Sequence, residues 1–218
     1  MDENDEVSKD IIKIRKAKFI NFLKKRNAWV IILLIIAIIL GIYIRALPMT
    51  DHGGNPGLYD VTTKNWTLGP DLDPWLFLRG AETIINEGKL PKIDYMRNVP
   101  LGFDNSIESQ LLPYMIVYTH KIVNIFGSYP IEFSGALFPV IMFGFTIISF
   151  FLFVRELFLR KNKNKDMKAN FIAIISCFFM IVIPVFLPRT VAGIPEKESA
   201  AFFFLFLATF LAFVAALY

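Results

Sequence analysis

Cysteine is almost absent from this sequence of 218 residues: the single one, Cys177, lies inside an apolar run. A small secreted domain held by disulfide bonds is therefore excluded. Charged residues are also scarce, at 19% against about 25% in typical soluble domains, while hydrophobic residues make up 55%. The apolar residues are concentrated in runs long enough to cross a bilayer, which excludes a soluble globular enzyme.

The short motifs of nucleotide, zinc and hydrolase sites are absent as well. The sequence has no glycine-rich phosphate loop, no dinucleotide fingerprint, no Cys/His zinc spacing and no serine nucleophile elbow. Its 23 phenylalanines and its lack of an internal repeat exclude the disordered and fibrous classes. The net charge of +4 comes from basic segments that flank apolar runs, so no nucleic-acid partner is expected.

Four apolar runs are predicted to be transmembrane helices: 28–47, 132–154, 169–188 and 199–218. This pattern indicates an all-α integral membrane protein. A cleaved signal peptide is the alternative for the first run, but Arg45, Leu47 and Pro48 follow it where small residues would mark a cleavage site. Because the last run ends with the chain, we expect an N-terminal piece of a longer membrane protein.

The distribution of Lys and Arg predicts the orientation of these helices. Basic residues gather in the tail 1–27 and in the loop 155–168, and the positive-inside rule places both in the cytoplasm. Both segments can share a side only if an even number of spans separates them. We therefore expect the intervening apolar segment, about 109–126, to be an amphipathic interfacial helix within a large external loop, 48–131. The short segment 189–198 is then external too.

Two acidic clusters face the outer compartment in this topology. Asp73 precedes Pro74 and Trp75 at the start of an expected helix, where an Asp ordinarily serves as the N-cap. Glu196 and Glu198 stand just before the last apolar run, where acids are ordinarily solvated loop residues. An ionisable group so close to the membrane is costly unless it is used or paired, which favours a functional interpretation.

Carboxylates from these two loops can together form an oxygen-ligand site for Mg²⁺ or Mn²⁺. The segment between Pro188 and Pro195 is short and rigid, so it would hold Glu196 and Glu198 at a fixed height above the membrane. Such a cation suits chemistry on a phosphorylated lipid, because it neutralises charge that builds up on a departing phosphate.

Two further polar residues have weaker interpretations. Asn65 begins an Asn-Trp-Thr tripeptide in the external loop and is a candidate glycosylation acceptor. His120, one of two histidines, is interpreted as part of the polar stripe of the interfacial helix.

Three stretches of the sequence together resemble a known family. Residues 73–79 read D-P-W-L-F-L-R, residues 99–102 read V-P-L-G, and residues 189–198 read R-T-V-A-G-I-P-E-K-E. Their order, spacing and predicted side of the membrane are similar to those of oligosaccharyltransferase catalytic subunits, over residues from about 28 to 218. The resemblance implies a helical GT-C glycosyltransferase fold and protein N-glycosylation. In that reaction an oligosaccharide passes from dolichyl phosphate or diphosphate to the Asn of an N-x-Ser/Thr sequon.

The resemblance also implies roles for particular residues. Asp73 matches the catalytic acid of the first external loop, and Glu196 and Glu198 match the two acids that complete a metal site for Mn²⁺ or Mg²⁺. Arg189 is a candidate contact for the lipid phosphate. The sequence departs from the family at Glu196, where Asp is usual, and Lys197 adds a positive charge between the two acids.

The implied partners are a lipid-linked oligosaccharide donor, a sequon-containing polypeptide and membrane lipids. The implied location is the cell membrane of an archaeon with the active site outside, or the endoplasmic reticulum membrane with a lumenal active site. Two alternatives stay open from the sequence: another GT-C enzyme, such as a protein O-mannosyltransferase, and a non-catalytic transporter or scaffold fragment. A transporter would more often place ionisable or helix-breaking residues at mid-membrane, which these runs avoid.

Overall fold

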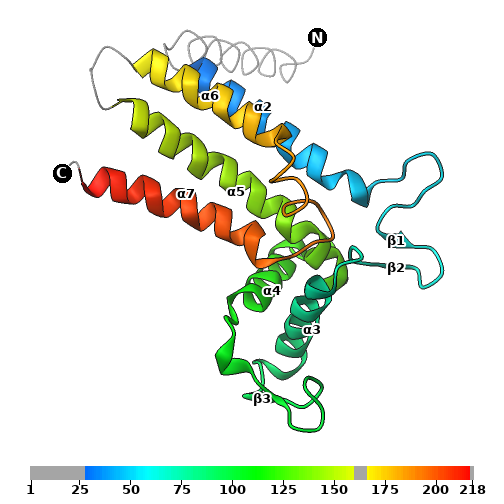
Figure 1. Cartoon of the computed structure of the whole chain (residues 1–218). Coiled ribbons are helices and arrows are strands. Elements are labelled where there is room, and N and C mark those ends of the chain that lie inside the picture. The colour runs from blue at the N-terminus through cyan, green and yellow to red at the C-terminus, as the bar shows by residue number, and fades with distance from the viewer. Residues whose placement is uncertain (1–27, 160–165, 217–218) are drawn as a thin grey trace, which may run out of the picture.

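A computed structural model describes residues 28–159 and 166–216. Four long helices lie side by side in it: α2 (Ala28–Ala46), α5 (Ile131–Leu159), α6 (Asp166–Val182) and α7 (Lys197–Ala215) (Figure 1). The basic tail 1–27 and part of the basic loop 155–168 lie outside the described residues. The helical class expected from the apolar runs is therefore confirmed for the described part of the chain.

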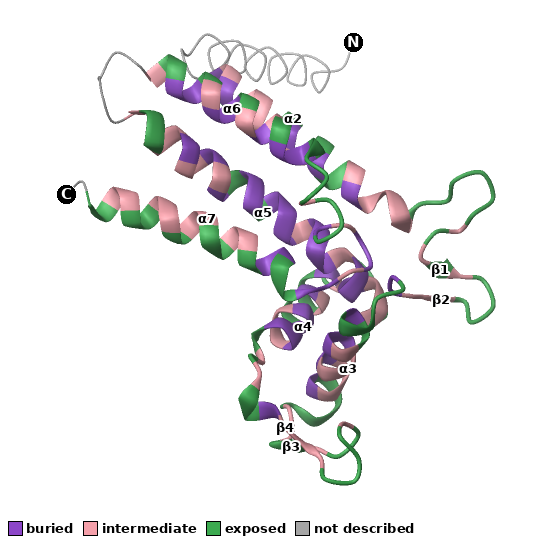
Figure 2. Ribbon diagram, in the orientation of Figure 1, coloured by how far each residue is buried: buried purple, intermediate pink, exposed green. Residues whose placement is uncertain are grey.

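α5 is the central helix of this layer, because it packs against α2, α6 and α7. Its buried side chains, such as Phe143 and Ile147, meet Ala37 of α2 and Ala173 of α6 in one apolar cluster. α7 touches the layer mainly along α5, and beyond Ala200 all of its residues are exposed or only partly buried (Figure 2). α2, α5 and α6 pack on one another and α7 packs on α5, so the layer has large apolar outer faces, the arrangement expected of helices surrounded by lipid.

Among the residues that the structure describes, three helical segments are long and apolar enough to cross a membrane: 28–49, 131–159 and 197–215. The span predicted over 169–188 has other bounds in the structure, because the helix there, α6, begins earlier and ends at Val182. Pro184 explains this end, since a proline disfavours helical backbone at the preceding residue and offers no N–H to the helix. The 17 residues of α6 are about 25 Å long, the short end of the range for a span. A count of four spans therefore stays a prediction.

The segment between α2 and α5 forms a separate body at one end of the layer (Figure 1). It contains the turn η1 (Leu47–Met49), a small hairpin of β1 (Tyr59–Asp60) and β2 (Asn65–Trp66), and the helix α3 (Leu72–Glu87). A second hairpin of β3 (Ile93–Asp94) and β4 (Phe103–Asp104), the turn η2 (Asn105–Ile107) and the helix α4 (Leu111–Val123) follow.

α3 and α4 pack on each other and on the first part of α5. Phe77 and Ala81 of α3, Ile116 of α4 and Phe138 of α5 share one buried cluster. The 13 residues of α4 are about 20 Å long, too short to cross a bilayer, so α4 does not act as a span of its own. The segment 183–196, between α6 and α7, lies at the same end of the layer as this body (Figure 1).

Candidate active site

Two glycines join the loop before α3 to the loop before α7. The amide of Gly69 donates a hydrogen bond to the carbonyl oxygen of Gly193 over 2.8 Å, and the amide of Gly193 donates to the carbonyl of Ala136 over 3.0 Å. Gly193 has a φ of +87°, and a Cβ there would lie 2.6 Å from Leu58 Cδ1. Only glycine fits this contact. The small residues of the segment 189–198, called the hinge from here on, thus allow the backbones of the two acid-bearing loops to touch.

Arg45, at the end of α2, holds the same hinge in place through hydrogen bonds. Its carbonyl oxygen accepts a hydrogen bond from the amide of Ala192 over 2.9 Å, and its Nε donates to Thr190 Oγ1 over 2.7 Å. Its Nη1 donates to the carbonyl of Ile181 over 3.2 Å, and its guanidinium carbon lies 3.1 Å from the ring centroid of Phe143. Arg45 is fully buried. The sequence interpretation used this residue only to mark the end of a span, although a charge at that depth was already a signal of function.

Glu196 is the buried acid of the hinge, with 4% of its surface exposed. Its carboxylate forms an ion pair with Arg189, whose side chain is half exposed. Burial raises the pKa of Glu196 above its ordinary value, the pairing with Arg189 opposes this, and the neighbouring Asp71 and Glu198 raise the pKa further. Burial disfavours the charged form of this carboxylate, and a neighbouring cation stabilises that form; in this structure the cation is Arg189.

The acid that reaches Glu196 from the first loop is Asp71. Asp71 is the N-cap of α3, since its Oδ1 accepts a hydrogen bond from the amide of Leu72 over 2.8 Å, and its side chain is near enough to Glu196 to raise the pKa of that acid. The expectation that Asp73 caps this helix was wrong. Asp73 lies in the first turn, and Pro74 is tolerated there because the first amides of a helix have no partner inside it.

The predicted metal-ligand set is not gathered as a cluster in this conformation. Asp73 and Glu198 are both exposed, at the first turns of α3 and α7. Within residues 28–159 and 166–216, no group of three His, Cys, Asp or Glu side chains is arranged to hold a metal ion. The two helix starts that carry these acids are nevertheless neighbours, because Lys197 Nζ lies 5.4 Å from the ring centroid of Phe77 in α3.

The other two polar residues singled out in the sequence have structural partners. The side-chain amide of Asn65 donates to Glu132 Oε1 over 3.0 Å, and Asn65 is half-buried. His120 Nδ1 lies 3.0 Å from Ser134 Oγ, and burial lowers the pKa of His120 while Glu132 opposes this. Both residues thus help to attach the external body to the start of α5.

The sequence and the fold are similar to those of known proteins. The model of the family described as oligosaccharyl transferase STT3, N-terminal, matches residues 30–217. The structure is similar to that of the archaeal oligosaccharyltransferase AglB from Archaeoglobus fulgidus in complex with an inhibitory peptide and a dolichol-phosphate. Their TM-score is 0.67 and their identity 22%, with 89% of this chain and 20% of that chain covered.

A second structure of the Archaeoglobus fulgidus oligosaccharyltransferase, a complex with Zn and sulfate, gives the same TM-score of 0.67 and the same identity of 22%. It covers 84% of this chain and 21% of that one. No curated protein sequence matches the chain closely.

At these identities the structural likeness shows the fold, and the chain spans about a fifth of the length of the structures that it matches. The apolar helices and the family together make it an integral membrane protein. Because the family model covers most of the sequence, this chain belongs to the STT3 N-terminal family of oligosaccharyl transferases.

Proposed function

We propose that the protein transfers an oligosaccharide from a dolichyl phosphate or diphosphate donor to the Asn of N-x-Ser/Thr sequons. The observation that carries this proposal is the contact between Gly69 and Gly193, which holds the starts of α3 and α7 together with their acids. An amide nitrogen is a poor nucleophile, so it needs positioned carboxylates and an electrophilic partner to react. Asp73, Glu196 and Glu198 are the carboxylates assigned to that task.

The residues present fit a hard divalent cation in chemistry. All three are carboxylates, the ligands that Mg²⁺ and Mn²⁺ prefer, and two of them are exposed to solvent. When bound, such a cation supplies charge neutralisation for the departing lipid phosphate. In this conformation the Glu196 carboxylate is paired with the guanidinium of Arg189. We therefore assign Arg189 two alternative partners, the Glu196 carboxylate and the phosphate of the donor.

The proposal includes a location for the chemistry. The end of the helical layer that carries α3, α4 and the hinge faces the outside of the cell membrane of an archaeon, or the lumen of the endoplasmic reticulum. Arg155 and Lys168, the basic residues of the loop 155–168 that the structure describes, lie at the opposite end, where the positive-inside rule favours the cytoplasm. Donor and acceptor then meet at the outer membrane surface.

The test is glycosyl transfer by the full-length protein in membranes, with a lipid-linked oligosaccharide and a fluorescent sequon peptide. Asp73→Ala should reduce transfer by at least about a hundredfold, because it removes a group that acts at the reacting centre. Asp51→Ala, which removes another exposed acid of the same external loop, is the matched control and should leave transfer unchanged. Full transfer by the Asp73→Ala protein would contradict the proposal.

A further inference from the structure

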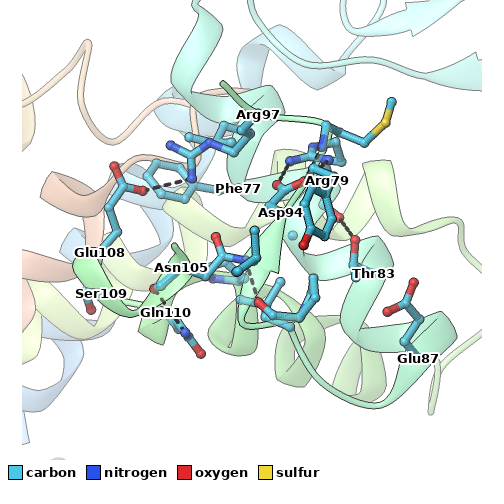
Figure 3. A pocket seen from close by; sticks show the side chains of 18 residues that line it. Phe77, Arg79, Thr83, Glu87, Asp94, Arg97, Asn105, Glu108, Ser109 and Gln110 are labelled. Atoms are coloured by element: carbon cyan, nitrogen blue, oxygen red, sulfur yellow. Dashed lines mark hydrogen bonds and ion pairs between the residues drawn. The ribbon is translucent and has the colours of Figure 1, made fainter. Parts of the chain in front are cut away.

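A hollow with a volume of about 310 Å³ lies in the external body, between one face of α3, the β3–β4 hairpin and the start of α4 (Figure 3). This volume is at the lower end of the range for small-molecule sites. None of the acids assigned to the transfer reaction lines it. The hollow is therefore a second candidate site, in the same body as the first.

Both arginines in the wall of the hollow are paired with acids. Arg79 forms an ion pair with Asp94, and Arg97 Nη1 lies 3.4 Å from Glu108 Oε2. Because each arginine already has a carboxylate partner, the hollow offers no strong attraction to a phosphate or another anion. One further acid, Glu87, lies on the α3 side (Figure 3).

The remaining polar groups of the wall both donate and accept hydrogen bonds. Thr83, Asn105, Ser109 and Gln110 bring hydroxyl and amide groups to the hollow, on two opposite sides of it (Figure 3). The Thr83 hydroxyl and one hydrogen of each side-chain amide already bond to backbone carbonyls, which leaves the oxygens and the second amide hydrogens for a ligand. A ligand that satisfies such a mixed wall needs many groups that can both donate and accept hydrogen bonds, and hydroxyls have this property. Tyr95 and Phe77 add aromatic rings to the wall, which suit the apolar face of a sugar ring.

Phe77 connects the hollow to the acid-bearing hinge. Its ring lines the hollow, and the centroid of the same ring lies 5.4 Å from Nζ of Lys197. Lys197 stands between Glu196 and Glu198 in the sequence. Asp71, the N-cap of α3, precedes Arg79 by eight residues of that helix, a rise of about 12 Å. A chain of several sugars that starts at the acids can thus extend along α3 into the hollow.

We propose that this hollow binds an uncharged monosaccharide unit of the donor glycan, away from the bond that is transferred. That the sugar belongs to the donor glycan rests on the proposed function, whereas the preference for a sugar rests only on the chemistry of the wall. Sequence reasoning did not find the site, because its polar residues come from three elements that only the fold brings together.

Saturation-transfer difference NMR tests the proposal, with the full-length protein in nanodiscs and free glucose, galactose, mannose and N-acetylglucosamine as probes. At least one sugar should receive saturation. Glu87→Ala and Tyr95→Ala should each weaken its binding by about 2- to 10-fold, the effect of one lost hydrogen bond or ring contact. Thr83→Leu should abolish binding by filling the hollow, whereas Asn86→Ala, on the same helix but outside the wall, should leave it unchanged.

Absence of saturation for all four sugars, or equal saturation in the Thr83→Leu protein, would overturn the proposal. So would displacement of the sugar by a sequon peptide that binds in its place. Glu196→Gln separates this inference from the proposed function: it should stop transfer and leave sugar binding intact. If the wild-type protein binds the sugar but has no transfer activity, only the proposed function is refuted. If it transfers normally but binds no sugar, only the sugar site in the hollow is refuted.

Discussion

The amide nitrogen of Gly69 lies 2.8 Å from the carbonyl oxygen of Gly193, and this hydrogen bond joins two loops that are far apart in the sequence. Each loop runs directly into a helix whose first turn carries an acid of the proposed site. The position of one acid relative to the other therefore depends on a backbone contact between two residues that have no side chains.

Gly193→Ala should separate the two loops. The new Cβ would lie 2.6 Å from Leu58 Cδ1 and 3.1 Å from the Gly69 amide, in addition to a backbone strain of about 1–2 kcal/mol. We expect loss of transfer activity with membrane insertion retained, measured by the peptide assay and by membrane fractionation. Gly88→Ala is the matched control, because Gly88 also has positive φ, +82°, but has open space around the new Cβ. If both proteins lose activity equally, the contact is not the cause.

Thr190→Val should weaken the attachment of the hinge to α2. The substitution removes the oxygen that accepts the hydrogen bond from Arg45 Nε. The buried guanidinium, whose Nη2 already has no partner among the described residues, then has a further unsatisfied donor, at a cost of about 1–3 kcal/mol. A lower midpoint of thermal unfolding in detergent should report this. Thr209→Val is the control, since its hydroxyl bonds only to carbonyls of its own exposed helix. Equal shifts in the two proteins would contradict a special role for Arg45.

Much of the architecture could be predicted from the sequence, because apolar runs and basic flanks directly reflect the energetics of a bilayer. The helix starts and the exact acids could not. Asp71 and Asp73 both stand near the start of α3, and the sequence alone does not decide that Asp71 caps the helix and lies near Glu196. Similarly, the end of α6 at Val182 follows from Pro184, whereas the apolar run continues past it.

The attachment of the second hairpin to α3 should be lost in acid. Burial alone would raise the pKa of Asp94, but hydrogen bonds from Arg79 and from the amide of Met96 lower this pKa below its ordinary value. A lowered pKa means that the stabilisation is complete above the unfolded-state pKa of about 3.9 and is lost as the pH falls through the folded-state pKa. Hydrogen exchange of the β3 and β4 amides between pH 2 and 5 would measure it.

Asp94→Asn is the control variant for this pH dependence. The amide hydrogens of its second hairpin should exchange faster than those of the wild type at pH 5. The part of the rise in exchange at low pH that comes from protonation of Asp94 should disappear. The pKa of Asp104 is also lowered, by hydrogen bonds from Ser106, so a smaller acid effect should remain. An unchanged pH profile in the Asp94→Asn protein would contradict the assignment.

The orientation of the chain is testable by cysteine accessibility. Ser106→Cys in the external body and Met167→Cys at the start of α6 should react from opposite sides of the membrane, because they lie at opposite ends of the helical layer. The native Cys177 is buried and serves as the background in both proteins. Reaction of both new thiols with an impermeant reagent from the same side would place the acids and the basic loop on one face.

The central claim is that acids from two loops form one cation site, and Mn²⁺ binding measured by electron paramagnetic resonance tests it most directly. In the full-length protein, Asp73→Asn and Glu198→Gln should each weaken Mn²⁺ binding by at least about tenfold, because each removes a hard anionic ligand from a different loop. Asp51→Asn should leave Mn²⁺ binding unchanged. Wild-type Mn²⁺ affinity in both the Asp73→Asn and the Glu198→Gln proteins would contradict the shared site.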